Sequence, residues 1–579
     1  MKLKTLSIKN FRNFEDISIT LSNKNVVFGM NDVGKTNFLY ALRFLFERKI
    51  RNKGFLESDF FQKDTTRVIE ICLEIDISDH ETDFDSQNII SKIGKERDSG
   101  NLNSVFIKVI ANFDENEFFG IPKLVWGNQE EELQKIPGEG TFCDLDRLFH
   151  VVYVDPLIDL DKIFSLNKRK IFSKQKTQSD GELLEYINVL AEQINSKIST
   201  MESVTKFQEI LTNEYHNLKN EDISVVLRSE MVINGVFNDL QPYITKNTDV
   251  TKKLYPTSGD GRKKILAYSL LNHITEEFNT NKTIPIFLIE EPENSLHRSM
   301  QIALSKQLFN QEIYRYFVMS THSSEMLYEM DKATLIRLCN EDRTIAKSFL
   351  YKVGEEFSKI KRELNESLTT ALFADRVLLI EGPSEKVLFE KILQEIQPNY
   401  ELEGGYILQV DGIKFKPYYK TLINLGINCI VKTDNDLKET TKNSSKQFEY
   451  IGYNRCVGLL DGNEWKKWEG YIEIDYSSSD REDKIKAWKK SNFNQIQKIQ
   501  QLRNKNIYLS KVDLENDLNE AIPETLELWR NTNHDAVPYL QKQKLMRMIK
   551  LCDFLKEEDC QQIYNHSLFE CLKKLTGDF

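Results

Sequence analysis

Residues Val377–Glu385 read VLLIEGPSE: four apolar residues, a carboxylate, a glycine, a proline, a serine and a second carboxylate. A short apolar run of this kind is typical of a strand buried in a parallel sheet. The pattern returns at Ile430–Asp436 (IVKTDND), and a third apolar run, Ile507–Leu509, precedes the acidic segment Asp513–Asp517 (DLEND). Because ligands bind at the carboxyl ends of parallel strands, the three acidic groups are expected at one edge of a sheet.

The first acidic group lies at a predicted turn from strand to helix. Pro383 suits the first position of a helix, and Gly382 is expected to permit the tight turn before it. Glu381 and Glu385 are four residues apart, a spacing that can place both side chains on one side of the first helical turn. The turn therefore predicts two carboxylates close together.

The second and third groups extend this prediction to a metal centre. Asp434 and Asp436 are two residues apart and share a face if the backbone there is extended. Any single acidic pair is most simply an exposed helix cap or turn, but three pairs after three apolar runs disfavour that interpretation. Hard carboxylate oxygens in such numbers suit Mg²⁺ or Mn²⁺. The candidate metal ligands are Glu381, Glu385, Asp434, Asp436, Asp513 and Glu515.

A phosphate-binding loop lies near the start of the chain. Gly29–Thr36 reads GMNDVGKT, which matches GxxxxGK[ST], and it stands between an apolar run and a helical pattern, as the motif requires. Backbone N–H groups of such a loop cradle phosphates, the lysine reaches the β- and γ-phosphates, and the threonine hydroxyl binds Mg²⁺. The candidate nucleotide-binding residues here are Gly29, Asn31, Gly34, Lys35 and Thr36.

Three further segments fit a nucleotide site. Ile286–Glu293 (IFLIEEPE) has a Walker B pattern, in which Glu290 would serve the metal and Glu291 would polarise water. Ser258 opens a predicted helix, and His322 follows a predicted strand. Each of the last two is more often structural when it stands alone, but their order along the chain favours contacts with phosphate.

Composition limits the other possibilities. The chain has 579 residues, a net charge of −11 and 40% hydrophobic residues, which indicates a globular protein of roughly three to five domains. No segment has the roughly 20 apolar residues of a membrane helix, and the N-terminal residues lack an apolar signal region. Eight cysteines form no CxxC pair, so neither a zinc ribbon nor a disulfide framework is indicated. We expect a cytoplasmic protein that does not associate with membranes.

The fold class that we predict is α/β: an ABC-type ATPase domain with a helical insertion, followed by a Toprim α/β domain with a helical C-terminal region. Long polar segments with apolar residues three and four apart indicate the insertion, expected either to mediate oligomerisation or to cover its own domain as a solvated layer. The predicted boundaries are 1–155 and 251–350 for the two ATPase parts, 156–250 for the insertion, 351–375 for a connecting helix and 376–579 for the Toprim part.

The nucleotide-binding half resembles the ABC-type ATPases of the SMC, RecF and OLD group. The resemblance implies a nucleotide held between two ATPase lobes, with Ser258 as the signature contact, Glu291 as the catalytic carboxylate and His322 as the switch histidine. The chain departs from the family at Glu290, where Asp is usual, and we find no Q-loop glutamine. ATP binding is therefore better supported than rapid hydrolysis. The resemblance rests on Lys9–Phe14, residues 29–36, Ser258-Gly259, Glu290–His297 and Ser320–Ser323.

The acidic half resembles the Toprim domain, and the order of the two halves is that of the OLD-family nucleases. The whole chain is similar to the nuclease subunits of Gabija anti-phage defence systems. That resemblance implies an endonuclease that nicks or cuts double-stranded DNA, forms a dimer or tetramer through its ATPase half and works with a helicase-like partner subunit. It rests on Tyr255–Arg262, Ala371–Ala374, Glu381–Glu385, Asp434–Asp436, Asp513–Leu518 and Tyr539–Leu545.

The resemblance also assigns roles to individual residues. Glu381 would be a metal ligand and general base, and Asp513 would complete the catalytic set with the other acids. Lys544 matches the family's catalytic lysine and would stabilise the charge that develops on the phosphate. We expect bound ATP to restrain cutting and its depletion to release it, because Glu290 weakens hydrolysis.

Two other functions share these motifs. A DNA-binding clamp of the SMC or RecF type, acting in repair with an inert acidic domain, would show DNA-stimulated ATPase activity without strand breaks. A topoisomerase or primase would also use a Toprim domain, but the 22 tyrosines nominate no nucleophile and no zinc-binding primase module is present. Six acids together with Lys544 favour the nuclease.

Overall fold

The computed structural model describes residues 1–30, 32–93, 103–136, 143–157, 160, 163–164, 178–218, 243–244, 255–256, 260–278, 283–340, 343–411, 415–442, 445–468, 481–495, 498–530 and 536–578. The chain forms two compact units. The first contains residues 1–153, 286–293 and 298–579, and the second contains residues 154–285 and 294–297. Each unit is described by itself.

The nucleotide-binding part is built on a six-stranded sheet in the order β14-β13-β3-β12-β11-β8. β3 runs parallel to both β12 and β13, and β11 runs parallel to β12. The apolar run before Glu290 is β11, and the strand predicted before His322 is confirmed as β12. The bounds are β3 (Lys24–Phe28), β8 (Phe149–Val154), β11 (Ile284–Glu290), β12 (Phe317–Ser320), β13 (Ala333–Asn340) and β14 (Thr344–Tyr351), with α1 (Lys35–Phe46), α2 (Arg48–Arg51), α4 (Asp144–Leu148), α9 (Arg298–Asn310) and α10 (Lys361–Ala371).

A second six-stranded sheet, antiparallel throughout, has the order β2-β1-β4-β5-β6-β7. At its edge β1 and β2 pair with Leu6 opposite Ile19 and Ile8 opposite Ile17. These alternate side chains are buried, as period-2 patterning requires. The bounds are β1 (Lys2–Phe11), β2 (Phe14–Thr20), β4 (Ile69–Asp76), β5 (Ser104–Asp114), β6 (Phe119–Gly127) and β7 (Gln134–Lys135).

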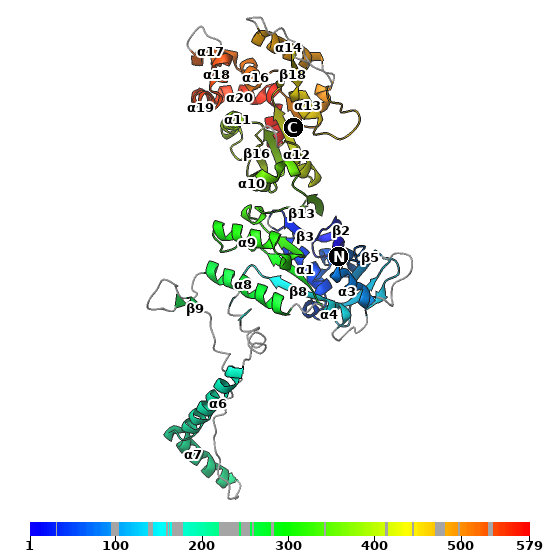
Figure 1. The fold of residues 1–579 in the computed structure, drawn as a ribbon, viewed down its shortest axis with the longest axis vertical. Helices are drawn as coiled ribbons and strands as arrows, with labels where there is room; N and C mark the ends of the chain where they lie inside the picture. Colours follow the sequence, from blue (N-terminus) through cyan, green and yellow to red (C-terminus); the bar gives the residue numbers. More distant parts are fainter. Residues whose placement is uncertain are drawn as a thin grey trace. The chain divides into compact units, whose positions relative to one another are not determined.

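The second unit contains the predicted helical insertion. Its described part includes two helices, which Figure 1 shows in teal as a consecutive pair. No helix in the described ranges of the chain is long and apolar enough to cross a membrane. The bounds are α6 (Gln178–Ser199), α7 (Glu202–Leu218), β9 (Tyr243–Ile244), β10 (Tyr255–Pro256) and α8 (Asp260–Phe278).

The acidic part is built on a parallel four-stranded sheet in the order β16-β15-β17-β20. The three apolar runs predicted to be neighbouring strands are β15, β17 and β20. Their buried residues explain the lack of polar alternation, because both faces of this sheet are covered. The bounds are β15 (Arg376–Ile380), β16 (Gly405–Gln409), β17 (Asn428–Thr433) and β20 (Ile507–Leu509), with α11 (Pro383–Ile396), α12 (Phe415–Asn424), the hairpin β18 (Leu437–Lys442) and β19 (Ser445–Tyr450), α13 (Ile451–Val457), α14 (Arg481–Gln495) and α15 (Ile499–Arg503).

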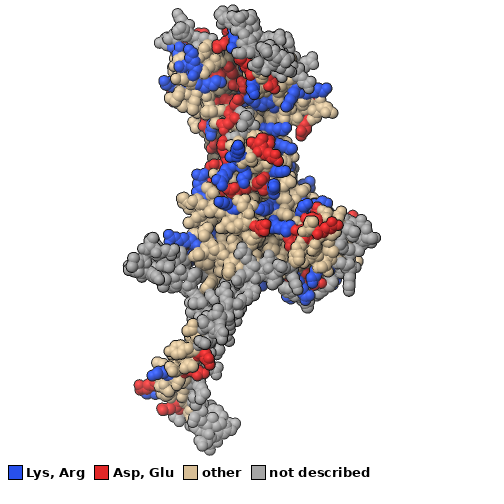
Figure 2. All heavy atoms as spheres, viewed as in Figure 1, with Lys and Arg blue, Asp and Glu red and all other residues tan. Residues whose placement is uncertain are grey.

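The C-terminal helices pack on α11 and share one apolar core with the parallel sheet. Inside this core Lys432 and Asp517 form an ion pair of 2.7 Å, with 1% and 0% of their side chains exposed. Figure 2 shows acidic side chains gathered in a band over the C-terminal part of the chain, beside basic ones. The bounds are α16 (Leu514–Ala521), α17 (Pro523–Arg530), α18 (Ala536–Lys542), α19 (Lys544–Phe554), α20 (Glu557–Asn565) and α21 (Glu570–Thr576).

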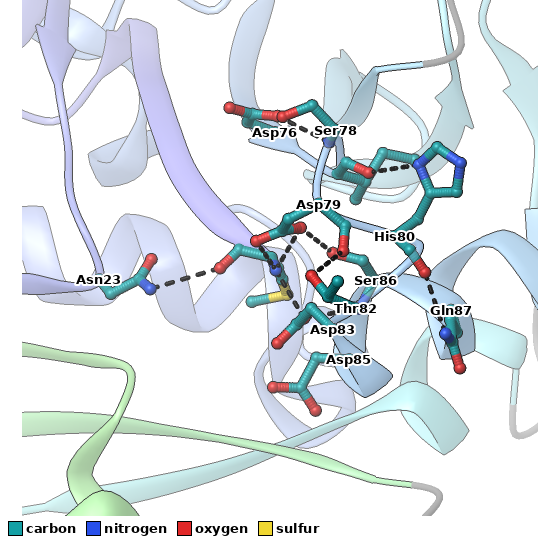
Figure 3. Close-up of polar contacts among 12 residues, drawn as sticks. Asn23, Asp76, Ser78, Asp79, His80, Thr82, Asp83, Asp85, Ser86 and Gln87 are labelled. Atoms are coloured by element: carbon teal, nitrogen blue, oxygen red, sulfur yellow. Dashed lines mark hydrogen bonds and ion pairs between the residues drawn. The ribbon is translucent and has the colours of Figure 1, made fainter.

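An acidic turn before α3 (Phe84–Ile93) links the two sheets of the nucleotide-binding part. The amine of Met1 donates to Asp79 at 2.8 Å and to Asp83 at 2.6 Å, and Figure 3 shows Asp79, Asp83 and Asp85 gathered at this turn. The hydroxyl of Tyr316, just before β12, donates to Asp85 at 2.7 Å. The charged partners hold the pKa of Asp79 and Asp83 below its ordinary value, against the opposing effect of burial. The turn therefore fixes the start of β1 beside the nucleotide-binding sheet.

Candidate metal centre and nucleotide-binding site

The first two acids lie where β15 passes into α11. Glu385, in the first turn of the helix, accepts hydrogen bonds through Oε2 from the N–H groups of Glu381 at 2.6 Å and Gly382 at 2.8 Å. This is a capping arrangement, which satisfies N–H groups that the helix leaves free. The Glu381 carboxylate is left to face the sheet edge, where its Oε2 accepts from Arg455 at 2.5 Å.

Gly382 does not have the role expected for it. Its φ is −145°, which is extended backbone open to any residue, and a Cβ added there would meet no atom within 4 Å. The prediction that Gly382 is what permits the tight turn is therefore wrong, because the backbone at this position is open to other residues. The chain turns because Pro383 occupies the first helical position and Glu385 caps the helix.

The two aspartates after β17 contact different cations. The strand ends at Thr433, so the alternation of a strand no longer governs the residues that follow. Asp434 Oδ2 lies 4.0 Å from Lys544 Nζ, and Asp436 Oδ2 accepts from Arg455 Nη2 at 3.4 Å. Asp434 therefore lies on the Lys544 side of the centre and Asp436 on the Arg455 side.

The third group comes from α16. Asp513 is its N-cap, and Oδ1 accepts from the N–H of Asn516 at 2.9 Å. Its Oδ2 accepts from the amide of Gln541 at 2.7 Å, so α18 orients this carboxylate. Glu515 is 1% exposed and its Oε1 lies 3.5 Å from Lys544 Nζ. The structure thus brings acids from three parallel strands together with the lysine at the start of α19.

Several carboxylate oxygens in this centre are buried without a hydrogen-bond partner. They are Glu385 Oε1, Asp434 Oδ1 and both oxygens of Glu515, of which Oε1 has only the longer ion pair with Lys544. Burying such atoms unpaired is costly, and hard oxygens oriented this way suit Mg²⁺ or Mn²⁺. The residues present therefore fit a divalent ion.

The acids do not already form a metal cage. Within the described residues, no group of three or more His, Cys, Asp or Glu side chains is placed so that it could hold a metal ion without rearrangement. Arg455 and Lys544 contact four of the six acids instead. The geometry is that of a charged centre balanced by the chain's own cations.

Electrostatics agree with this description. Burial, with the charge of Glu381 beside it, raises the pKa of Glu385 to about 7. Burial and the neighbouring acids, Glu385 first, also raise the pKa of Asp434 well above its ordinary value. Burial lowers the pKa of Lys544, but Glu515, Asp434 and Asp513 more than offset this and the net shift is upward. A protonated lysine beside partly neutralised acids indicates an excess of negative charge, as a metal centre requires.

These shifts predict how the stability of the metal-free protein depends on pH. Glu385 keeps its proton to about pH 7 when folded, against an ordinary value of 4.5. The folded state therefore binds the extra proton between these values, and its stability falls as pH rises through about 7. Glu385→Gln mimics the neutral form and should raise the melting temperature at pH 8 more than at pH 6, measured in EDTA. An equal change at both pH values would contradict the raised pKa.

The phosphate-binding loop is closed on itself. Lys35 Nζ donates to the carbonyls of Met30 at 2.8 Å and Gly29 at 3.1 Å. Gly34 has a φ of 99°, and a Cβ there would lie 2.2 Å from the side-chain nitrogen of Asn13. Asn13 in turn donates to the carbonyl of Val33 at 2.9 Å. The loop therefore needs glycine at position 34 both for its backbone and for close packing.

Glu290 at the end of β11 is held from two sides. The hydroxyl of Thr36 donates to Oε1 and the hydroxyl of Tyr153, on β8, donates to Oε2. Arg43 lies over the Tyr153 ring, 3.8 Å from its centroid. Thr36 and Glu290 are thus adjacent, as a shared Mg²⁺ would require, and Tyr153 occupies the second oxygen.

The switch segment lies beside the Walker B acids. Glu291 has a φ of 40°, a strained value for a residue with a side chain, and such strain concentrates at functional positions. His322 Nε2 lies 3.6 Å from Glu291 Oε1, and the His322 N–H donates to Glu293 at 2.6 Å. Burial and the charge of Lys35 lower the pKa of His322. The imidazole is therefore held near the loop mainly in its neutral form.

Two predicted residues, Asn31 and Ser258, lie outside the described residues. Conversely, the structure adds Arg455, Gln541 and Tyr153, which sequence reasoning missed. Gln541 belongs to the segment Tyr539–Leu545, which carries the family resemblance and contains Lys544, so this segment is the sequence signal that could have found it. Arg455 and Tyr153 carry no motif, because only the packing of α13 and β8 brings them to the two sites.

Comparison with known proteins places the chain in a family. The AAA ATPase domain family matches residues 1–327, and the TOPRIM domain of proteins like the overcoming lysogenization defect protein matches residues 372–436. The endonuclease GajA of Bacillus cereus (strain VD045) is 46% identical over 579 residues, which is 100% of this chain and 99% of that protein. The chain belongs to the GajA family of OLD-type endonucleases.

More distant similarities agree with this GajA-family membership. The Old nuclease of Escherichia phage P2 is 20% identical over 468 residues, covering 75% of this chain and 77% of its own. Among solved structures, the SMC head domain from Thermotoga maritima aligns over 61% of this chain and 100% of its own at 13% identity, with a TM-score of 0.31, too low to bear on the fold.

Proposed function

We propose that this GajA-family chain is a divalent-metal-dependent endonuclease that nicks or cuts double-stranded DNA in anti-phage defence. The observation that carries the proposal is the set of buried carboxylate oxygens without a hydrogen-bond partner, gathered near Lys544 after three parallel strands. The family relationship supports the same activity. A helicase-like partner subunit is proposed on the family resemblance alone.

The chain's own groups would divide the work of cleavage. Glu381, Glu385, Asp434, Asp436, Asp513 and Glu515 would hold the divalent ions. When bound, such ions activate water and stabilise the leaving oxygen. Half of the Lys544 side chain is exposed, so its ammonium can reach a phosphate as well as Asp434 and Glu515. Its raised pKa keeps it positive at neutral pH, which suits it to stabilise charge on the phosphate.

The direct test is a plasmid assay. Purified protein, free of added nucleotide, is incubated with supercoiled plasmid and Mg²⁺ or Mn²⁺, and nicked and linear forms are separated. The proposal expects strand breaks that EDTA abolishes. ATP hydrolysis stimulated by DNA without any strand break would instead support an SMC- or RecF-like clamp.

We further propose that ATP in the ATPase part restrains cutting. Glu290 replaces the shorter Asp usual at this position, and both its oxygens accept hydrogen bonds from side chains. A longer, tied carboxylate disfavours the fine positioning that hydrolysis needs. Bound ATP would then persist and act as a sensor of nucleotide supply.

A contact path joins this sensor to the parallel sheet within the first unit. The His322 ring stacks on Phe373, with centroids 6.2 Å apart and planes 21° from parallel. Phe373 also contacts Phe28 at the end of β3, and it lies three residues before β15. Arg337 on β13 adds an ion pair of 2.6 Å with Asp375. Movement of His322 on binding phosphate would therefore reach the strand that carries Glu381.

Phe373→Ala should separate the two activities. Removing the ring breaks the stack with His322 but leaves both sites intact, so we expect ATP binding and nucleotide-free cutting to persist while restraint by ATP weakens severalfold. Nicking rates with and without ATP give the readout. Phe118→Ala, at an exposed phenylalanine, is the control. Full restraint by ATP in Phe373→Ala would exclude this path.

We propose that the insertion pairs with a second copy of the chain. Leu183, Tyr186, Leu190 and Ile194 lie at helical spacing on one face of α6, and each is 41–63% exposed. An apolar stripe left in water is typical of a helix that packs against a partner. Because most soluble oligomers are built from identical chains, a dimer or tetramer is the expected assembly.

Leu190→Glu combined with Ile194→Glu should reduce the oligomer. Charges in the centre of an apolar interface disfavour association, so the molar mass by light scattering should fall toward that of one 67.8 kDa chain. Ser196→Glu introduces the same charge away from the stripe and should leave the mass unchanged. An unaltered mass in the double variant would place the assembly contacts elsewhere.

A further inference from the structure

Arg455, on α13, lies among the acids that follow β15 and β17. Its Nη1 donates to Glu381 Oε2 at 2.5 Å and also to the Thr433 hydroxyl, and its Nη2 donates to Asp436 Oδ2 at 3.4 Å. Only 15% of its side chain is exposed. The guanidinium lies over the Phe415 ring, 5.5 Å from the centroid. It therefore bridges the ends of β15 and β17.

The acids divide between two cations of unlike character. Glu381 and Asp436 face Arg455, whereas Asp434 and Glu515 face Lys544. Lys544 is half exposed and can leave its partners for a phosphate, but Arg455 is enclosed by its partners and by Phe415. A guanidinium also binds carboxylates with several fixed donors, which makes it a firmer partner than an ammonium. The Arg455 guanidinium is thus a fixed part of the metal-free centre.

The negative charge of Glu381 and Asp436 explains why the metal-free centre contains a cation. Glu381 and Asp436 both pair with the Arg455 guanidinium, and a partly buried carboxylate is less stable without a cation beside it. A divalent ion held by these two carboxylates would supply the same neutralisation. Ion and guanidinium would therefore compete for one position.

We propose that Arg455 is an internal counter-ion for Glu381 and Asp436, and that a divalent ion enters this half of the centre by displacing it. Arg455 is then a positioning residue that sets the metal concentration at which the centre fills. The inference rests on the proposed function, because it requires the six acids to bind metal. It also explains why the acids form no cage while Arg455 is in place.

The test measures metal affinity without DNA or cleavage. Free Mn²⁺ is followed by electron paramagnetic resonance as it is titrated into the full-length protein. Arg455→Gln should bind one Mn²⁺ about tenfold more tightly than the parent, because a competing positive charge a few ångströms away is gone. Arg455→Lys, which keeps the charge without the fork, should lie between them.

A matched control is available on α14. Arg481 also pairs with a carboxylate, Glu439 at 2.7 Å, and lies over a ring, Phe448 at 5.7 Å, but it contacts none of the six acids. Arg481→Gln should leave the Mn²⁺ affinity unchanged. Thermal melting gives a second readout, in which metal-free Arg455→Gln melts below the parent and saturating Mn²⁺ closes the gap.

The outcomes separate the inference from the function on which it rests. Weaker or unchanged Mn²⁺ binding by Arg455→Gln overturns the counter-ion and leaves the metal-dependent nuclease standing. A parent protein that binds no Mn²⁺ overturns both. If Arg455→Gln does not fold, Arg455→Lys decides the matter, since tighter binding supports displacement and weaker or equal binding refutes it.

Discussion

Glu381→Gln is expected to lower the plasmid cleavage rate by more than about a hundredfold at saturating Mg²⁺. Losing a partner that merely orients a metal ligand typically costs about 10- to 100-fold, and Glu381 is itself proposed as a ligand. The substitution keeps the size of the side chain and an oxygen that can accept from Arg455, so the fold should persist. Initial nicking rates over a range of Mg²⁺ concentrations give the measurement.

The control for Glu381→Gln is a substitution on α11, the helix that follows Glu381. Glu390 on α11 is half-buried and pairs with Lys386 at 3.7 Å, so Glu390→Gln removes one charge without changing any of the six acids. It should cut at the parental rate. If Glu381→Gln also cuts at that rate while Mn²⁺ binding is retained, the assignment of the nuclease centre is wrong.

Lys35→Ala is expected to abolish restraint by ATP and leave nucleotide-free cutting in place. A hydrogen bond to a charged group contributes about 1.5–3 kcal/mol, so ATP affinity should fall about tenfold to a hundredfold. Lys35 also holds the loop through the Gly29 and Met30 carbonyls, and the variant loses this contact as well. Cutting at an ATP concentration that restrains the parent should then proceed as if no nucleotide were present.

Equilibrium ATP binding and nicking are measured on the same Lys35→Ala preparation. Lys49→Ala, at an exposed lysine on α2, is the matched control and should bind ATP and be restrained as the parent is. Restraint that survives in Lys35→Ala, with ATP binding lost, would mean that nucleotide acts at another place on the chain.

Much of the fold follows from local sequence patterns. The short apolar runs before Glu290 and Glu381, and Ile430-Val431 before Asp434, lie in strands, because runs of this length and composition are typical of strands buried in a covered sheet. The phosphate-binding loop at Gly29–Thr36 is equally readable, because its glycines and lysine have fixed spacing. Motifs of this kind are formed by residues that are close together in the sequence, so they can be recognised without the structure.

The remaining parts of the sites depend on packing between distant segments. Arg455 and Glu381 are 74 residues apart, and Tyr153 and Glu290 are 137 apart, yet each pair is in hydrogen-bond contact. No periodicity in the sequence indicates which arginine will contact the strand-end acids or which tyrosine will contact Glu290. At Gly382 the sequence suggests a feature that is absent. A glycine beside a turn suggests that the backbone needs glycine there, but a φ of −145° is open to other residues.

The pairing of β20 with β17 has a consequence for how the protein is made. Glu381 and Asp434 leave the ribosome well before Asp513, Glu515 and Lys544, and the last three join the centre only after β20 docks and the helices behind it fold. Nascent domains fold in order from the N-terminus. The acids after β15 and β17 are therefore made before the groups that complete the proposed metal centre. A chain that is still being synthesised lacks Asp513, Glu515 and Lys544, and with them one side of that centre.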